Sequence, residues 1–332
     1  MKNSIAFKKR KNQNSIIQHR LKADNSKLKI QNSYSPGYSL PSLARPLVAC
    51  QSKKGRGKPQ SGAGVGLQGY GFKTHPIMQL TIRISEHAMS FSKREADSTI
   101  SHEPYHMKSG VSTAANLRQA FNDSHMLAEQ HRSARVLIDT PVLVIPADEC
   151  DNEKAEQLYA YTYGEDKSVE VMTSMLESAN VVVAFAVNRD LKLVLDDNFK
   201  MVTFLPLMLP VWQHLHADSY KSAKRKMYAY LHGKTMELVS FRQNHIVFCN
   251  RFDASMAADA VYYTLNAWQQ LGMKPSDDLL DIIGTTATTD KYVQMAGEFV
   301  SNVAKREPSS LLAEENTQEL PFDLLALYDN LI

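Results

Sequence analysis

The chain has 332 residues, 43% of them hydrophobic, and a formal net charge of +3, so it can bury one or two hydrophobic cores. Its longest apolar stretch, 201–212, contains two prolines and is far shorter than the ~18 residues of a membrane-spanning helix. The N-terminus lacks the apolar h-region of a secretory signal, and the three widely spaced cysteines match neither a zinc ribbon nor a redox pair. These features predict a reduced, cytoplasmic protein without membrane insertion.

Residues 1–77 hold 15 Lys/Arg and a single acid, Asp24, whereas the remainder has a net charge of −11. This composition predicts a disordered basic extension. It also fits an arm that contacts nucleic-acid phosphates, or an organelle-targeting peptide. A third alternative is that translation starts at Met78, directly before the first convincing strand. The glycine run 62–71 has no flanking strand or helix, so it predicts a flexible linker rather than a dinucleotide loop.

The folded part begins with Leu80, Ile82 and Ile84 alternating with polar residues, which predicts a strand with one apolar face. The pattern favours neither helix nor strand over 165–176. The other elements expected in the first half are strands at 79–85, 88–92, 99–102 and 135–138, an extended segment at 141–146, a buried strand at 181–187, and helices at 111–130, 149–161, 189–198 and 206–216.

The pattern then restarts. The elements expected in the second half are strands at 225–231, 235–241, 244–250 and 279–283, and helices at 255–271 and 288–304. Each half therefore contains a three-strand meander followed by helix, strand and helix. A duplicated unit of this kind predicts two α/β lobes with a cleft between them.

Several segments of 78–332 together carry a resemblance to known proteins. They are LTIRISEHAMSFS at 80–92, VLIDTPVLVIPADE at 136–149, VVVAFAVNRDL at 181–191, NRF at 250–252, DAVYYTL at 259–265, QLG at 270–272 and LPFDLLALYD at 320–329. With the duplicated unit, they resemble the actin-like ATPase (ribonuclease H-like) superfamily, and more narrowly an uncharacterised Bacteroidetes family of that fold. The resemblance implies an α/β protein of two lobes with a central cleft, the first over 78–218 and the second over 219–332.

Active members of this superfamily hold nucleotide phosphates in the turn between the first two strands of each lobe. An aspartate near the end of each first strand holds metal and water, and glycines let backbone amides approach the phosphates. In this chain the first aspartate position falls near Arg83 and the glycine position near Ser85. The second aspartate position falls near Tyr230, and Gly233 alone remains after His232. The resemblance therefore implies two degenerate phosphate loops without a metal ligand or a catalytic residue.

A third superfamily motif, which lies beside the adenosine, corresponds to Gly284-Thr285-Thr286 at a strand-to-helix transition. These residues and Gly233 are a candidate remnant of a nucleotide or anion site, because the amides of a helix N-terminus attract anions. The alternative is an ordinary helix start capped by threonine. No cofactor is predicted, and binding of Mg-ATP stays an alternative.

Other polar clusters predict structural roles. His214 and His216 stand two positions apart on an expected helix and so diverge, which with Asp218 predicts a solvated helix end rather than a metal site. Asp277, Asp278 and Asp281 are expected to cap a turn. The apolar segment 322–328 predicts either packing on the second lobe or a peptide that docks on a partner or second copy.

Three hypotheses for function follow. The first is a non-catalytic actin-like module that acts through protein–protein contacts or self-association with an unidentified partner. The second is a divergent nucleotide-dependent ATPase or phosphotransferase. The third is nucleic-acid contact through residues 1–77, since the acidic remainder, 78–332, does not favour a nucleic-acid-binding surface.

Overall fold

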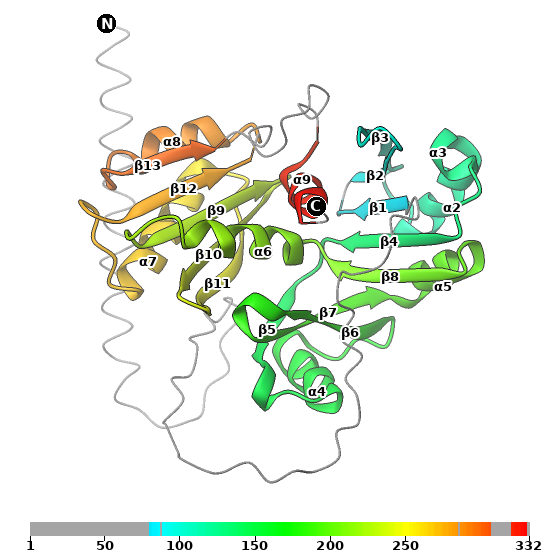
Figure 1. Cartoon of the computed structure of the whole chain (residues 1–332), viewed down its shortest axis with the longest axis horizontal. Coiled ribbons are helices and arrows are strands. Elements are labelled where there is room, and N and C mark those ends of the chain that lie inside the picture. Colours follow the sequence, from blue (N-terminus) through cyan, green and yellow to red (C-terminus); the bar gives the residue numbers. More distant parts are fainter. Residues whose placement is uncertain (1–79, 87, 285, 307–319, 331–332) are drawn as a thin grey trace, which may run out of the picture. The chain divides into compact units, whose positions relative to one another are not determined.

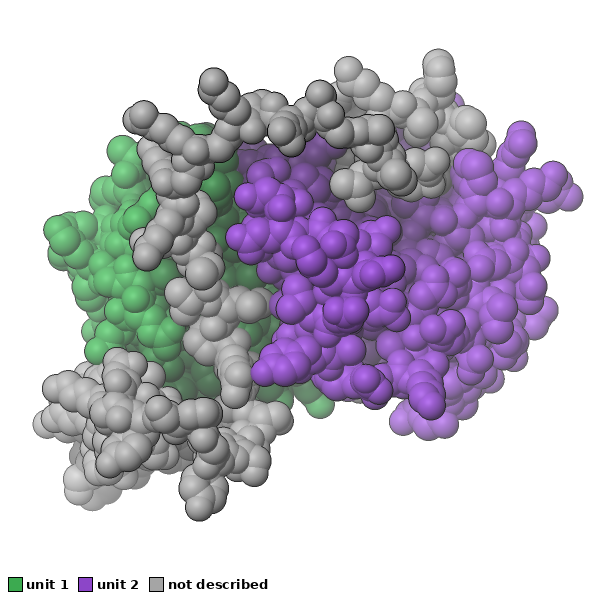
Figure 2. Space-filling model, turned by 90° about the horizontal axis from the view of Figure 1, so that it is seen from below, with its two compact units in different colours: residues 1–50, 219–307 green, residues 51–218, 308–332 purple. Residues whose placement is uncertain are grey.

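The computed structural model describes residues 80–86, 88–284, 286–306 and 320–330, and Figure 1 shows their course. These residues form two compact units, here called the first lobe (80–218 with 320–330) and the second lobe (219–306). Figure 2 draws the first lobe in purple and the second in green. The extension predicted over 1–77 and the start predicted at Met78 lie outside the described residues.

The first lobe contains a five-stranded sheet with the spatial order β3-β2-β1-β4-β8. Its strands are β1 (Leu80–Ile84), β2 (Ala88–Arg94), β3 (Ile100–His106), β4 (Ser133–Ile138) and β8 (Met201–Pro206). β1, β2 and β3 pair antiparallel, whereas β4 pairs parallel with β1 and β8. Along β1, Leu80, Ile82 and Ile84 enter a hydrophobic core. Because side chains alternate along a strand, Thr81 and Arg83 lie on the opposite face of the sheet.

Three of the helices of this lobe pack against the core on one face of the sheet: α2 (Thr113–Asp123), α3 (His125–Ala128) and α5 (Arg189–Asn198). Leu117 of α2 and Leu195 of α5 pack in the same core as β1, so these helices cover one face of the sheet. The single helix predicted over 111–130 is interrupted at Ser124. The Ser124 hydroxyl accepts a hydrogen bond from the Leu127 amide at 3.1 Å, so it caps a new short helix rather than continuing α2.

A subdomain of residues 142–188 is inserted into the first lobe. It comprises β5 (Val142–Pro146), β6 (Val169–Leu176), β7 (Val181–Asn188), α4 (Asn152–Tyr163) and the short turns η1 (Ala147–Glu149) and η2 (Glu177–Ala179). Its strands form an antiparallel sheet in the order β5-β7-β6, so residues 165–176, ambiguous in sequence, contain a strand. Phe185 packs in the core of the lobe and Ala184 in a separate cluster under α4. The strand predicted over 181–187 is thus buried on both faces, as its apolar run indicates.

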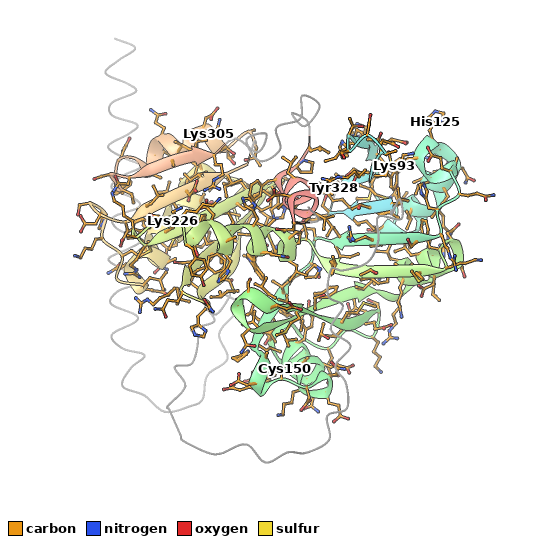
Figure 3. The ribbon with its side chains drawn as sticks, viewed as in Figure 1. Lys93, His125, Cys150, Lys226, Lys305 and Tyr328 are labelled. Atoms are coloured by element: carbon orange, nitrogen blue, oxygen red, sulfur yellow. The ribbon has the colours of Figure 1, made fainter. Side chains whose placement is uncertain are left out.

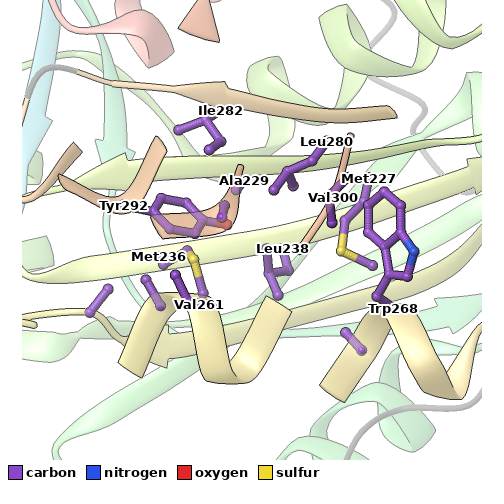
Figure 4. Packing of buried hydrophobic residues seen from close by; sticks show 14 of the residues in the cluster. Met227, Ala229, Met236, Leu238, Val261, Trp268, Leu280, Ile282, Tyr292 and Val300 are labelled. Carbon is purple, nitrogen blue, oxygen red and sulfur yellow. The ribbon is translucent and has the colours of Figure 1, made fainter. Parts of the chain in front are cut away.

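The second lobe repeats the sheet of the first in the order β11-β10-β9-β12-β13. Its elements are β9 (Lys226–His232), β10 (Thr235–Arg242), β11 (His245–Asp253), α7 (Ala257–Gln270), β12 (Leu279–Ile283), α8 (Thr289–Ala296) and β13 (Val303–Arg306). β9, β10 and β11 pair antiparallel, and β12 pairs parallel with β9 and β13. Figure 4 shows Met227, Leu238, Val261 and Tyr292 in the core that joins this sheet to α7 and α8. The predicted duplication is therefore confirmed.

The sequence predictions missed one strand in each lobe, β8 and β13. The run 201–212, predicted as helical from 206, divides into β8 and helix α6 (Met208–Ser219), with Pro206 ending an edge strand where its missing N–H is tolerated. The helix predicted over 288–304 ends at Ala296, and β13 follows at Val303. Val303 continues the helical spacing of α8 but packs against the core from a strand, which explains the error.

The last described element, helix α9 (Phe322–Asp329), makes its polar contacts within the first lobe. The sequence repeat places residues up to 332 in the second lobe, so the structure differs here. The hydrogen-bond partners of α9 on β1 and β2 belong to the sheet face opposite α2 and α5. The seven residues of α9 from Phe322 to Tyr328 are buried. No helix among the described residues has the length and hydropathy required to span a membrane.

Candidate functional site

The residue predicted to stand in the first phosphate loop, Arg83, belongs to a buried ion pair. Arg83 donates from Nε to Asp323 Oδ1 at 2.7 Å and from its terminal amino group to Asp323 Oδ2 at 2.8 Å. Asp323, in the first turn of α9, is fully buried. Both carboxylate oxygens therefore receive the planar fork of one guanidinium, which is the strong bidentate form of this pair.

Further polar contacts fix α9 on the same sheet face. The Tyr328 hydroxyl donates to Ser92 Oγ at 2.9 Å, and Arg94 donates to the Tyr328 carbonyl at 3.2 Å with its guanidinium 5.7 Å from the ring centre. Burial raises the pKa of Tyr328, so its hydroxyl stays protonated and can donate. Figure 3 marks Tyr328 on α9. Its hydroxyl and the Asp323 carboxylate therefore anchor α9 to two neighbouring strands.

The turn between β1 and β2 uses its own backbone groups. The Ser85 amide donates to the Ala88 carbonyl at 2.9 Å, and the Ser85 hydroxyl donates to the same oxygen at 3.0 Å. A phosphate-binding turn presents its amides to the ligand. Here the amide at the expected glycine position is already bonded within the turn.

The residues predicted to stand in the second phosphate loop, Tyr230 and His232, form an aromatic pair. Tyr230 and His232, on the β9 face away from the core, are buried and stack with ring centres 5.0 Å apart. Gly233 follows in a two-residue hairpin turn with φ +56, a conformation that favours glycine, and a Cβ there would meet no atom within 4 Å. The turn therefore keeps the glycine that its backbone needs, beside side chains that cannot coordinate a metal as a carboxylate does.

Gly284 has a structural reason of its own. It adopts φ +126, and a Cβ there would lie 2.3 Å from the carbonyl oxygen of Leu231 on β9. A side chain at this position would thus collide with the backbone of the neighbouring strand. Close packing of β12 and β9 is sufficient to explain this glycine.

The threonines after Gly284 bond to one another. The hydroxyls of Thr286 and Thr289 share a hydrogen bond at 2.9 Å, in which either can be the donor. The Thr286 amide donates to Thr289 Oγ1 at 3.1 Å. Thr288 Oγ1 lies 3.1 Å from Thr286 Oγ1. Thr285 lies outside the described residues. The hydroxyls at the start of α8 thus form a local cap, and the role of these residues as an anion-site remnant stays a prediction.

Two buried acids of the second lobe differ from the sequence analysis: Glu237 was not foreseen, and Asp281 was placed in a turn. Glu237, opposite Tyr230 on β10, forms an ion pair with Arg251 at 3.4 Å. Asp281, expected to cap a turn, lies inside β12 and pairs with Arg306, whereas Asp278 does cap the turn by accepting the Lys274 amide at 2.7 Å. The available signal was an acid between apolar neighbours in a strand, as in Met236-Glu237-Leu238.

The sequence predicts a solvated helix end for the histidines of α6, and the structure does not show one. His216 and Asp218 are buried, and His214 Nδ1 lies 2.9 Å from Asp329 Oδ2 of α9. The apolar side of α6 is wider than the spacing of the histidines suggests, so the prediction was wrong. Among the described residues, no three His, Cys, Asp or Glu side chains are grouped as a metal site would require.

Comparisons with known proteins agree with this architecture. Residues 72–303, more than half of the chain, match the family described as a protein of unknown function, DUF3822. A crystal structure from Bacteroides thetaiotaomicron, described as a protein with an actin-like ATPase fold and unknown function, is 22% identical, with a TM-score of 0.68 over 76% of this chain and 96% of that chain. This likeness shows the actin-like ATPase fold that the sequence predicts.

Two further structures are less similar. The PilM–PilN type IV pilus biogenesis complex shows 11% identity and a TM-score of 0.48 over 76% of this chain and 98% of that chain. The cytoplasmic domain of EpsL, an inner membrane component of the type II secretion system of Vibrio cholerae, shows 13% identity and a TM-score of 0.38, covering 75% and 93%. No curated protein matches the sequence.

Proposed function

The chain belongs to the DUF3822 family of unknown function, and we propose that it is a non-catalytic actin-like module, a pseudo-ATPase that acts through protein–protein contacts or assembly. The proposal needs no cofactor and assigns Mg-ATP no role. It places the module in the cytoplasm, a reducing compartment in which the free thiols Cys150 and Cys249 are stable.

The observation that carries the proposal is the Arg83–Asp323 ion pair. A guanidinium stays protonated at any physiological pH and has no acceptor, so it cannot be a metal ligand. Both oxygens of Asp323 already accept hydrogen bonds from that guanidinium, so the pair is neutral as a whole and offers a divalent cation no uncompensated carboxylate.

The second lobe supports the same conclusion independently. Tyr230 stands at the position of the second aspartate, and its ring is stacked on His232 in a buried site. Neither group supplies a fixed negative charge for a metal. Buried carboxylates of this lobe, Glu237 and Asp281, are neutralised by arginines.

The test measures phosphate release and thermal stability of the intact chain with Mg-ATP. A ligand at about 100 times its Kd stabilises the native state by about 2.7 kcal/mol, which raises the Tm by several degrees. We expect no rise in Tm and no release above the rate without protein. Gly233→Ala is the matched variant, because a Cβ there meets open space.

Saturable hydrolysis of Mg-ATP that Gly233→Ala abolishes would overturn the proposal and favour a divergent phosphotransferase. A rise in Tm without hydrolysis would overturn only the statement that Mg-ATP has no role, and would leave the non-catalytic module in place. The two readings are separable, because thermal shift reports binding and phosphate release reports chemistry.

A further inference from the structure

The inserted subdomain, residues 142–188, concentrates the negative charge of the folded chain. It has nine acidic side chains against two lysines, a net charge of −7. Eight of the nine acids are exposed, and they are Asp148, Glu149, Asp151, Glu153, Glu156, Glu165, Asp166 and Glu177. In the described part of the chain, their ion pairs are limited to Asp151 with Lys154. The lysines of the subdomain therefore balance only a small part of its negative charge.

One flank of α4 adds exposed apolar side chains to these acids. The helix buries only Ala155 and Tyr159, while Leu158 is 42% exposed and Tyr161 is 83% exposed. The hydroxyls of Tyr159 and Tyr163 bond to carbonyls at the start of β5, so that flank faces β5. Leu158 and Tyr161, three positions apart, share the other flank of the helix with Lys154, whose charge is paired with Asp151.

The neighbouring sheet extends this surface. Val171 of β6 packs against the cluster beneath α4, and the two-residue period of a strand puts Met175 on the same sheet face. Met175 is 40% exposed, and Glu177 follows it. We call Leu158, Tyr161 and Met175, with the acids on α4 and in its adjoining turns, the α4 surface. Exposed apolar residues inside a charged rim are typical of an interaction site.

We propose that the α4 surface is the docking site for residues 53–72 of the same chain. That segment lies outside the described residues and has the complementary chemistry: four Lys/Arg and no acid in 53–58, followed by Leu67, Tyr70 and Phe72. Cations would face the exposed carboxylates, and the apolar residues would cover Leu158 and Tyr161. The inference does not depend on the function proposed above.

Chain length permits this contact. The chain between Lys58 and Leu80, the first residue of β1, can span at most roughly 70 Å at ~3.3–3.6 Å per residue. If the glycine-rich tether behaves as the flexible linker predicted from its sequence, its root-mean-square span is about 25 Å. The effective concentration is then on the order of millimolar, which would occupy a contact with a dissociation constant below that value.

Zero-length cross-linking tests the proposal in the intact chain. A carbodiimide joins a lysine amine to a carboxylate only when the two are in contact, and peptide mass spectrometry locates the bond. We expect links from Lys53, Lys54 or Lys58 to Glu153, Glu156, Glu165 or Glu177. The yield should fall about tenfold at ~1 M salt, where the Debye length is about 3 Å.

Charge reversal separates a specific site from diffuse attraction. Glu153→Lys with Glu156→Lys should remove the links, and Tyr161→Ser should lower their yield by about two- to tenfold. The matched control, Asp196→Lys with Asp197→Lys, makes the same change of charge at exposed positions on α5 and should leave them intact. Links that persist in the first variant, or that are lost equally in the control, would overturn the proposal.

Two more measurements keep the outcome decisive. Trypsin cleavage after Lys53, Lys54 and Arg56 should be accelerated about tenfold by the reversal at Glu153 and Glu156, and unchanged by the control. In a mixture of isotope-labelled and unlabelled chains, the two peptides of each cross-link should be both labelled or both unlabelled. Links between labels would assign the α4 surface to a second copy and so contradict docking of the same chain.

Discussion

The ion pair between Arg83 and Asp323 gives the sharpest quantitative prediction. Asp323 is fully buried, and both its oxygens accept hydrogen bonds from one guanidinium. Asp323→Asn keeps the shape of the side chain but removes the negative charge that both hydrogen bonds of the guanidinium face. Removing one member of such a pair costs about 3–5 kcal/mol. With an m-value of about 2 kcal/mol/M, the urea midpoint of the first lobe should fall by roughly 1.5–2.5 M.

Tryptophan fluorescence can follow the first lobe alone. The chain has two tryptophans, Trp212 in the first lobe and Trp268 in the second, so Trp268→Phe leaves a reporter only in the first. The reporter is sensitive because Trp212 is buried. The measurement is a urea titration of Asp323→Asn in that background. Using one reporter avoids the assumption that both lobes unfold together.

The double variant Arg83→Met with Asp323→Leu is the decisive arm. Replacing a buried pair by apolar groups of similar volume is often neutral or stabilising, so this variant should unfold nearer to the parent than either single change. Glu129→Gln is the control, since half-exposed Glu129 pairs with Lys93 at 2.6 Å and should contribute less than about 1 kcal/mol. A loss below about 1 kcal/mol for Asp323→Asn, or a double variant as unstable as the sum of the singles, would refute the reasoning.

Three further predictions concern stability. Gly284→Ala should lower the unfolding free energy of the second lobe by about 2–4 kcal/mol, because the new Cβ would lie 2.3 Å from the Leu231 carbonyl oxygen. Gly233→Ala should lower it by only about 1 kcal/mol, because its φ is positive but no atom lies near the new Cβ. Urea titration followed by Trp268 fluorescence compares the two variants. Burial raises the pKa of Cys249 from 9.0 to about 12, so its stabilising effect is fully present below pH 9 and is lost as pH rises toward 12, at about 1.4 kcal/mol per pH unit. Cys249→Ala should flatten that decline of unfolding free energy, and an unchanged slope would contradict the assignment. Ending the chain at Arg306 should abolish the cooperative Trp212 transition, since five large apolar side chains of α9 contribute roughly 2 kcal/mol each; a retained transition would show that α9 is dispensable.

The duplicated fold was largely predictable because most strands of the two meanders have a clear apolar pattern. β1, β9 and β12 bury one face or both, and the turns that join β1 to β2 and β9 to β10 are short, so pattern and structure agree. β8 and β13 were missed for a different reason. Each is a short strand at the edge of its sheet, preceded by a helix, and its apolar residues extend an existing helical period.

The candidate site was only partly predictable. The sequence predicts that Arg83 and Tyr230 replace the aspartates of the superfamily motifs, but it does not predict which residues each of them contacts. Asp323 is 240 positions from Arg83, and no local pattern relates them. The signal that could have helped is an acid within the apolar segment 320–329, since a carboxylate in a buried helix needs a partner.

Helix α9 makes the first lobe discontinuous along the chain, which has a consequence for biosynthesis. Residues 80–218 leave the ribosome first, yet one face of their sheet stays uncovered until residues 322–329 have been made. The second lobe, by contrast, is a continuous stretch that can finish folding earlier. Long-range closure is slow, and transiently exposed apolar surface invites aggregation. The lobe that begins first is therefore completed last, because the contacts of α9 with β1 and β2 can form only at the end of synthesis.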